Sequence, residues 1–292
     1  MYDEREEMFL DLVEMRKRSN IIKISIILLS FILIIISIFT GIKLRQFLEN
    51  SKFEKEQLIF GRNKISHKVN FEKPIDQNTI SKIKEIYKSE EKRAFLTFDD
   101  GPSKTVTPVL LDFLKEKNIK GNFFVLGSRV ELYPDIVKRA YEEGHYIANH
   151  GYSHVYTSIY SSPQAVVDEY IITETQIKNA VNNSEYNSNI FRFPGGSVGG
   201  KYRDIKNEAI QMLEQMNVGY VDWNALTGDS AGKLTKEEMI DHLVQTTTNK
   251  NSIVILMHDA GDKILTYEVL PDIILYLEEQ GYSFKSFYDI ID

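Results

Sequence analysis

The chain contains no cysteine among its 292 residues. It can therefore form no disulfide, no thiolate zinc site and no cysteine nucleophile. An excess of basic residues is also missing, because 35 Lys and Arg stand against 42 Asp and Glu and give a net charge of −7. Since the phosphate backbone favours clustered Lys and Arg, we expect no nucleic-acid partner, and we expect no nucleotide cofactor. The length accommodates one large domain, not two, with appendages.

One stretch near the N-terminus has no charged residue. From Ile24 to Ile42 the chain consists mainly of Ile, Leu and Phe, and its length matches the ~20 residues that a helix needs to cross a bilayer. No alanine precedes Ala94, so no Ala-x-Ala cleavage site of a signal peptide follows the run. The sequence therefore predicts a retained single-pass anchor.

Basic residues favour one orientation for that anchor. They cluster at positions 16–23, and such a flank usually stays in the cytoplasm. We therefore expect the catalytic domain outside the cytoplasm and the protein in the cell membrane. The predicted parts are a cytoplasmic segment (1–20), a transmembrane helix (21–43), a stalk with one amphipathic helix (44–92) and a catalytic domain (93–292).

Beyond residue 93, short apolar runs alternate with stretches of helical character. Such repeated units predict a parallel sheet covered by helices, either a barrel or an open doubly wound sheet. In both architectures the functional residues gather at the C-terminal ends of the strands. The predicted strands are Ala94–Phe98, Gly121–Leu126, His145–Asn149, Asn189–Phe193, Gly219–Trp223, Ser252–Met257 and Tyr282–Ser286.

Two adjacent carboxylates, Asp99 and Asp100, follow the first of these strands and precede Gly101-Pro102. Neighbouring carboxylates repel, so they persist together mainly where a cation or a proton separates their roles. A solvated Asp-Gly-Pro turn is the alternative interpretation. The histidines and the arginine further along the chain favour a functional role.

His150 and His154 lie four residues apart, and with Asp100 they make two imidazoles and one carboxylate. Three such ligands are typical of a catalytic zinc that keeps one position open. The same set also suits non-haem iron. Asp99, the second carboxylate, favours hydrolysis because a metal-activated water needs a base beside it.

Two further strand ends carry polar groups or glycine. Arg192 could pair with Asp99 and hold it ionised, although an arginine that merely covers a barrel end is the alternative. Gly195-Gly196 allows close approach of a ligand, so its N–H groups are candidate oxyanion donors. His258 follows the apolar run Ile253–Met257 and is the candidate proton donor to a leaving group.

Four motifs together resemble the polysaccharide deacetylase family, also called the NodB-homology domain or carbohydrate esterase family 4. They are Thr97–Pro102, His150–His154, Arg192–Gly196 and Leu256–His258, in family order. The resemblance implies a distorted (β/α) barrel, here of about seven strands, and metal-dependent removal of acetyl groups from sugars. It assigns Asp99 as the base, Asp100, His150 and His154 as metal ligands, Arg192 as the residue that orients the base, His258 as the acid, and Leu256 as part of the acetyl pocket.

Several positions depart from the family pattern. Gly151 replaces a Ser or Thr, and Gly195 replaces a bulky residue; in the fourth motif an acid and a tryptophan are replaced by Leu226 and Ser230. The change at Gly151 should mildly affect the loop that holds the ligands. The other changes alter the groove walls, so they bear on the identity of the substrate more than on the type of reaction.

Two aspartates could support His258. Aligning Trp223 with the tryptophan before the family's fourth motif favours Asp229, while Asp222 would have a structural role or line the cleft. We also place Trp223 among the substrate-contacting residues.

The expected activity is hydrolysis of N-acetyl groups from an N-acetylated polysaccharide, with peptidoglycan amino sugars favoured by the combination of anchor and family. The expected cofactor is one divalent metal ion, zinc foremost, with Co, Ni, Mn and Fe as alternatives. An O-acetyl polysaccharide esterase would share every motif, and a non-catalytic glycan-binding relative or a ferrous oxygenase are further alternatives. The last two conflict with the presence of Asp99 together with all three candidate ligands.

Overall fold

The computed structural model describes residues 77–291. The predicted cytoplasmic segment, the transmembrane helix at 21–43 and most of the stalk lie outside the described residues, so they stay predictions. Within 77–291 no helix combines the length and the apolar character needed to span a bilayer.

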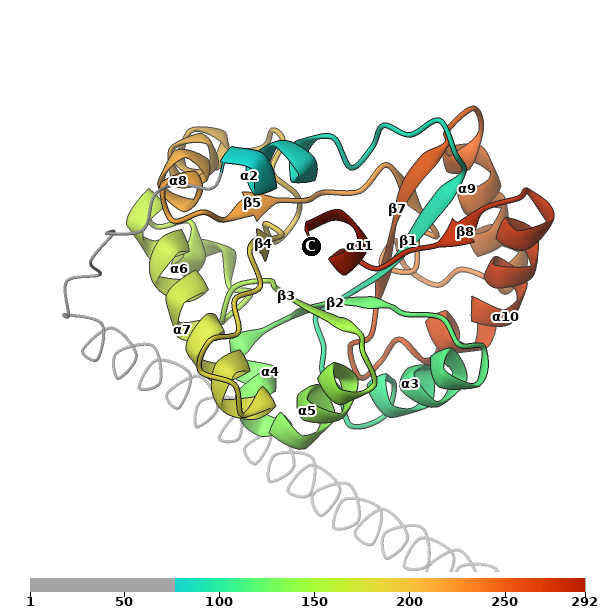
Figure 1. The fold of residues 1–292 in the computed structure, drawn as a ribbon, viewed down its shortest axis with the longest axis horizontal. Helices are drawn as coiled ribbons and strands as arrows, with labels where there is room; N and C mark the ends of the chain where they lie inside the picture. Colours follow the sequence, from blue (N-terminus) through green and yellow to red (C-terminus); the bar gives the residue numbers. More distant parts are fainter. Residues whose placement is uncertain (1–76, 292) are drawn as a thin grey trace, which may run out of the picture. The chain divides into compact units, whose positions relative to one another are not determined.

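The described strands form one curled sheet in which every pairing is parallel (Figure 1). Their order across the sheet is β5-β4-β3-β2-β1-β7-β6, and the short β8 pairs with the beginning of β1. The strands are β1 (Arg93–Asp99), β2 (Asn122–Val125), β3 (Tyr146–Asn149), β4 (Ile190–Phe191), β5 (Gly219–Tyr220), β6 (Ala225–Leu226), β7 (Ser252–His258) and β8 (Ser283–Phe284).

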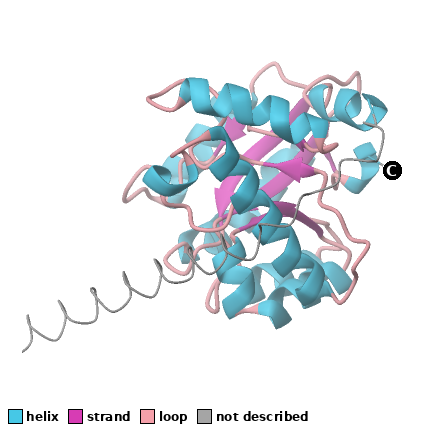
Figure 2. Cartoon of the chain, turned by 90° about the vertical axis from the view of Figure 1, so that its left-hand side faces the viewer, coloured by secondary structure: helices cyan, strands magenta, loops and turns pink. Residues whose placement is uncertain are grey.

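Helices surround this sheet, as the side view in Figure 2 shows. Several begin where the sequence has a cap residue or proline: α7 starts with Ser162 accepting from the Ala165 N–H, and α9 starts with a capping box between Thr235 and Glu238. The described helices are α2 (Gln77–Lys84), α3 (Thr107–Glu116), α4 (Gly127–Leu132), α5 (Pro134–Glu142), α6 (Tyr156–Ile159), α7 (Pro163–Val181), α8 (Arg203–Gln215), α9 (Lys236–Thr247), α10 (Ile264–Glu279) and α11 (Tyr288–Ile291).

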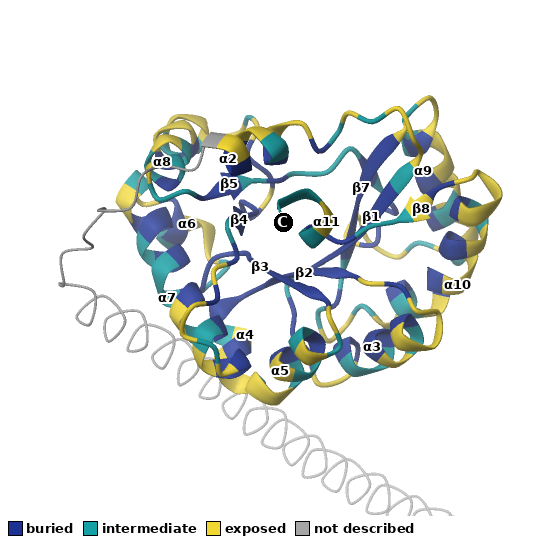
Figure 3. Cartoon of the chain, in the orientation of Figure 1, coloured by how far each residue is buried: buried dark blue, intermediate teal, exposed yellow. Residues whose placement is uncertain are grey.

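Each strand separates an outer apolar layer from the interior of the barrel. Successive side chains of a strand point to opposite faces. On β1, Leu96 packs in the cluster below the helices while Phe95 packs in the interior cluster. On β7, Ile255 and Val254 are divided in the same way. Figure 3 shows most of the strands buried, with β8 the exception, and the outer faces of the helices exposed.

One end of the barrel interior is filled by apolar side chains. Phe287, just before α11, has its ring 5.5 Å from that of Phe95, 5.7 Å from Phe124 and 5.4 Å from Tyr146, measured between centroids. Figure 1 shows α11 in the middle of the ring of strands. Ile83 and Ile86, in and just after α2, belong to the same cluster. The described part of the predicted stalk thus contributes to the core of the barrel.

All seven predicted strands are present, but the sequence analysis missed β6. The expectation of a parallel α/β fold is confirmed, and of the two architectures left open the structure has the barrel-like one. The barrel is incomplete, because β5 and β6 end the strand order without pairing with each other.

Candidate active site

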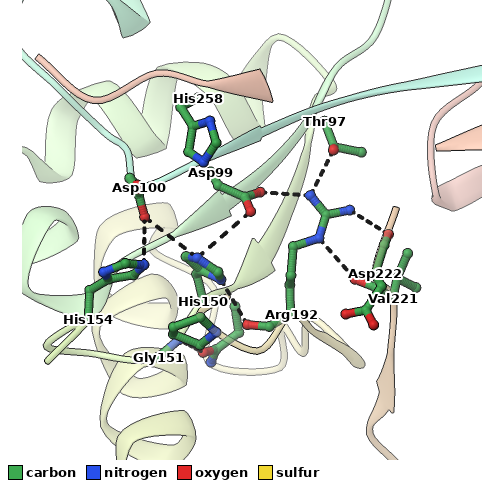
Figure 4. A network of polar contacts seen from close by, with 12 residues as sticks. Thr97, Asp99, Asp100, His150, Gly151, His154, Arg192, Val221, Asp222 and His258 are labelled. Atoms are coloured by element: carbon green, nitrogen blue, oxygen red, sulfur yellow. Dashed lines mark hydrogen bonds and ion pairs between the residues drawn. The ribbon is translucent and has the colours of Figure 1, made fainter. Parts of the chain in front are cut away.

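The candidate residues lie on the inner face of the sheet at the C-terminal ends of the strands. Asp99 follows Phe95 at even spacing on β1, and His258 follows Val254 in the same way on β7, so both point toward the interior side. Asp99 and His258 are also register partners in adjacent strands. The strand pattern therefore brings these two groups to one mouth (Figure 4). Phe287 fills the other end, where it packs on Phe95 and Tyr146 near the beginnings of β1 and β3.

Asp100, His150 and His154 form one compact group. Their candidate ligand atoms all lie within 4.8 Å of one another. Asp100 Oδ1 is 3.5 Å from His150 Nε2 and 3.3 Å from His154 Nε2. Ligands about 2.1 Å from one tetrahedral ion lie about 3.4 Å apart. The spacing of this trio therefore fits a single divalent ion.

Two further observations support the fit. Asp100 Oδ1 is buried and has no hydrogen-bond partner, a costly state for a carboxylate oxygen unless a cation compensates it. The His150 Nδ1–H donates to the Arg192 carbonyl oxygen at 2.8 Å, which leaves Nε2 as the lone-pair atom facing Asp100. Burial lowers the pKa of His150 to about 3, although Asp100 opposes this shift. His150 is thus neutral, as a metal ligand must be.

The loop that carries the histidines is held by a residue that the sequence analysis missed. Glu169, on α7, is buried and accepts hydrogen bonds from the Tyr152 and Ser153 N–H groups at 2.9 and 3.0 Å and from the Ser153 hydroxyl at 2.6 Å. His154 has a left-handed backbone, with φ of 54°, a conformation that needs such support in a residue with a side chain. No local sequence signal connects Glu169 to this loop.

Arg192 fixes the second carboxylate. Its side chain is fully buried and donates from Nη1 to Asp99 Oδ1 at 2.8 Å and to the Thr97 hydroxyl at 2.8 Å. Its guanidinium lies 3.8 Å from the centroid of the Phe124 ring and donates to backbone carbonyls as well. With Oδ1 held in this way, Oδ2 of Asp99 faces the candidate metal ligands and lies 3.8 Å from His150 Nε2.

Burial raises the pKa of Asp99 above its ordinary value, although Arg192 and His258 lower it. A buried carboxylate is a stronger base than one in water when it is ionised. The ion pair with Arg192 keeps it ionised, so Asp99 combines basicity with a fixed orientation.

Asp229 is the aspartate that contacts His258. Asp229 Oδ1 is 2.9 Å from His258 Nδ1, and Oδ2 accepts from the His258 N–H at 2.7 Å and from the Thr266 hydroxyl at 2.9 Å. Asp222 instead accepts from the backbone and the hydroxyl of Ser197. The contact predicted between Asp229 and His258 is therefore present, and Asp222 holds a loop.

The charge on His258 depends on this contact. Burial alone would lower the pKa of His258, but the hydrogen bond with Asp229 and the charge of Asp229 raise it to about 9. His258 is therefore protonated at neutral pH, with Nε2 left to donate.

The remaining predicted residues line the surroundings of the mouth. The Gly195 N–H has no hydrogen-bond partner among the described residues, as expected for a donor kept for a ligand. Leu256 lies two residues before His258 on the same face of β7 and is nearly buried. Trp223 lies against Gly196, and its ring is 5.8 Å from the Arg192 guanidinium. The open cavity of about 340 Å³ that Trp223 also helps to line lies beside α2, and neither the metal-binding trio nor Asp99 or His258 lines it.

Asp259 is a second buried acid that the sequence analysis did not single out. It follows His258 directly, accepts from the Thr107 hydroxyl at 2.6 Å, and lies so close to Gly101 that a side chain there would collide with its carboxylate. Burial raises the pKa of Asp259 to about 7. It packs below the turn that carries Asp99 and Asp100. In the sequence, its position directly after His258 was the one signal that could have pointed to Asp259.

Comparisons with known proteins agree with this geometry. Residues 87–218 match the family model described as polysaccharide deacetylase. A peptidoglycan-N-acetylglucosamine deacetylase of Bacillus cereus is 31% identical over 205 residues, which is 68% of this chain and 71% of that protein. A carbohydrate esterase family 4 esterase of Streptococcus mutans superposes with a TM-score of 0.64 at 29% identity, covering 71% of this chain and 90% of that chain. The catalytic domain of a peptidoglycan N-acetylglucosamine deacetylase of Eubacterium rectale gives 0.62 at 30% identity, covering 68% and 90%.

Proposed function

Since this chain belongs to the polysaccharide deacetylase family, and is thus a deacetylating hydrolase, we propose that it removes N-acetyl groups from the amino sugars of peptidoglycan. The observation that carries the proposal is the arrangement of an oriented base, Asp99, and a protonated acid, His258, on adjacent strands beside a metal-binding trio. Relatives described as peptidoglycan deacetylases support the choice of substrate.

Asp100, His150 and His154 would hold one divalent ion, for which the nitrogen and oxygen donors favour zinc, with Co, Ni, Mn or Fe as alternatives. When bound, such an ion supplies Lewis-acid activation of water and of the acetyl carbonyl. The neutral state of His150 and the unpartnered Oδ1 of Asp100 are the protein's contribution to that site.

Asp99 accepts the proton of the attacking water at Oδ2. Its other oxygen, Oδ1, is occupied by Arg192, so the free oxygen has one orientation and faces the ligands. Arg192 positions the base and balances its charge.

His258 donates a proton from Nε2 to the departing amine. An amine anion is a very poor leaving group, so this protonation is needed for the C–N bond to break. Asp229 holds the imidazolium by Nδ1 and keeps it charged at neutral pH. The products are acetate and a free amino sugar.

Three residues are assigned to the substrate itself. The Gly195 N–H is a donor to the oxyanion of the tetrahedral intermediate. Leu256 forms part of the pocket for the acetyl methyl group. Trp223, whose ring lies against Gly196 next to Gly195, contacts the sugar chain.

The test is acetate release by the purified, metal-loaded protein from three substrates: peptidoglycan, chitin oligomers and acetylated xylan. The proposal predicts release from the first two and little from the third, together with one equivalent of divalent metal by elemental analysis. Preferential release from acetylated xylan would identify an O-acetyl esterase. A protein that binds glycan without releasing acetate from any substrate would be a non-catalytic relative.

We further propose that residues 21–43 anchor the protein in the cell membrane with the N-terminus in the cytoplasm and the catalytic domain outside. The uninterrupted apolar run and the basic residues at 16–23 support this topology. Protease added to intact cells should release the domain from its anchor. Cleavage that occurs only after lysis would reverse the topology.

A further inference from the structure

Tyr156 forms a wall of the mouth beside the metal-binding trio. It begins α6, two residues after His154, and the two rings lie 5.7 Å apart between centroids. The side chain is 41% exposed, so a ligand can reach it. Tyr156 lies outside the four family motifs, and the sequence analysis assigned it no role.

The hydroxyl of Tyr156 lies directly over Gly195. A Cβ atom placed on Gly195 would lie 2.5 Å from Tyr156 Oη, so the phenol occupies the space that a side chain at position 195 would take. Gly195 also has φ of 74°, in the region that favours glycine. A glycine here therefore makes room for the hydroxyl as well as for the turn.

Two hydrogen-bond donors thus lie together without a protein partner. Neither the Gly195 N–H nor the Tyr156 hydroxyl bonds to any residue in 77–291. Both residues are exposed, so a ligand can reach the two donors. A pair of accessible donors beside candidate metal ligands is suited to binding a developing negative charge.

The tyrosine is also held in place. Its ring packs on that of Tyr160 at 5.7 Å, and the Tyr160 hydroxyl donates to the Pro194 carbonyl oxygen at 2.7 Å. Tyr160 therefore connects Tyr156 to the loop that carries Gly195. This connection fixes the two donors relative to each other before a substrate binds.

We propose that the Tyr156 hydroxyl is a catalytic donor that hydrogen-bonds, together with the Gly195 N–H, to the oxyanion formed from the acetyl carbonyl. The inference rests on the proposed deacetylation. As water adds to the carbonyl carbon, the C=O π electrons move to oxygen, the water proton goes to Asp99, and Tyr156 donates a hydrogen bond without losing its proton. When the C–N bond breaks, those electrons re-form the C=O bond and His258 protonates the amine.

The test is Tyr156→Phe, which keeps the ring and removes the donor, with Tyr267→Phe as the matched control. Tyr267 lies on α10, and its ring packs on Phe113. With chitin oligomers, Tyr156→Phe should lower kcat about 10- to 100-fold, at the lower end of the usual effect of one oxyanion donor because the residue is partly exposed. KM and bound metal should stay within about twofold, and Tyr267→Phe should behave like the wild type.

A binding measurement separates this role from a structural one. A phosphonamidate analogue of the N-acetyl group, which carries the tetrahedral oxygen, should bind Tyr156→Phe more weakly by the same factor that kcat/KM falls, as measured by calorimetry. Unchanged analogue affinity, or a higher KM at unchanged kcat, would overturn the proposal. A wild-type protein that releases no acetate would refute the proposed function instead.

Gly195→Ala supplies a second, independent test. In the wild type the new methyl group collides with the Tyr156 hydroxyl; in the Tyr156→Phe background that hydroxyl is gone, while the backbone cost at φ of 74° is the same. The two substitutions should therefore be less than additive in kcat/KM. Strict additivity would show that the hydroxyl and Gly195 act separately and would overturn the shared site.

Discussion

At the end of β3, His150 is neutral; at the end of β7, His258 is charged. Burial is the largest influence on both and lowers the pKa of each, yet the pKa of His150 falls to about 3 and that of His258 rises to about 9. Both also have carboxylates nearby. Asp229 shares a 2.9 Å hydrogen bond with His258, whereas Asp100 lies 3.5 Å from His150.

The contrast shows that a nearby carboxylate is not enough to charge a buried histidine. A direct hydrogen bond to a ring N–H stabilises the imidazolium and compensates for its lost hydration. The ring N–H of His150 instead donates to a backbone carbonyl oxygen, which carries no full charge. One mouth thereby contains a neutral candidate ligand and a charged candidate acid.

The largest effect on this contrast should come from removing the imidazole of His150, the neutral candidate ligand. His150→Ala should lower zinc affinity by more than about 100-fold, since even changes to the partners of metal ligands cost 10- to 100-fold. A competition titration against a chromophoric chelator measures this. His242→Gln, on α9, is the control and should bind zinc as the wild type does. Unchanged affinity in His150→Ala would place the ion elsewhere.

Asp99 lies between the two histidines, and its substitution should lower kcat while zinc stays bound. Asp99→Asn should keep zinc but lower kcat by about 10² to 10⁴, because an amide cannot accept the proton. Asp222→Asn is the matched control: it holds Ser197 rather than the water and should cost less than about tenfold. If Asp99→Asn hydrolyses chitin oligomers at the normal rate, another residue is the base.

A smaller effect, on pH dependence alone, sharpens the comparison. The acid form of His258 is present below its pKa and is lost as pH rises through about 9, so kcat/KM should fall on the alkaline side near that value. Asp229→Asn removes the charge that raises the pKa, so the alkaline limb should move down by more than about one pH unit. A pH profile with soluble oligomers checks this, and an unmoved limb would assign it to another group.

The smallest effect on either histidine should come from the opposite end of the barrel. Phe287→Ala removes a fully buried ring and should lower the free energy of unfolding by about 3 to 5 kcal/mol, as measured by urea denaturation. At temperatures where the variant is folded, the alkaline limb should not move. A shifted limb would mean that the packing at this end also sets the pKa of His258.

The sequence by itself determined the strands and most of the chemistry. Apolar runs predicted all seven strands, because a parallel strand buried on both faces is nearly continuous in apolar residues. The residues after those runs supplied Asp99, Asp100, His150, Arg192 and His258, since parallel strands carry their functional groups at one end.

Only the tertiary structure decided between partners that are distant in sequence. β6 has just Ala225 and Leu226, too short for any periodic signal, yet Leu226 pairs with Leu256 and so brings Asp229 to His258. Asp222 follows β5, whose neighbour is β4, and cannot take that place.

The tertiary structure alone also places Glu169 below the loop that carries the histidines and Tyr156 over Gly195. Sequence patterns record which face of an element is apolar, and this determined the strands and the ends at which the functional groups lie. Contacts between side chains of separate elements depend on strand order, register and packing, and these leave no local pattern in the chain.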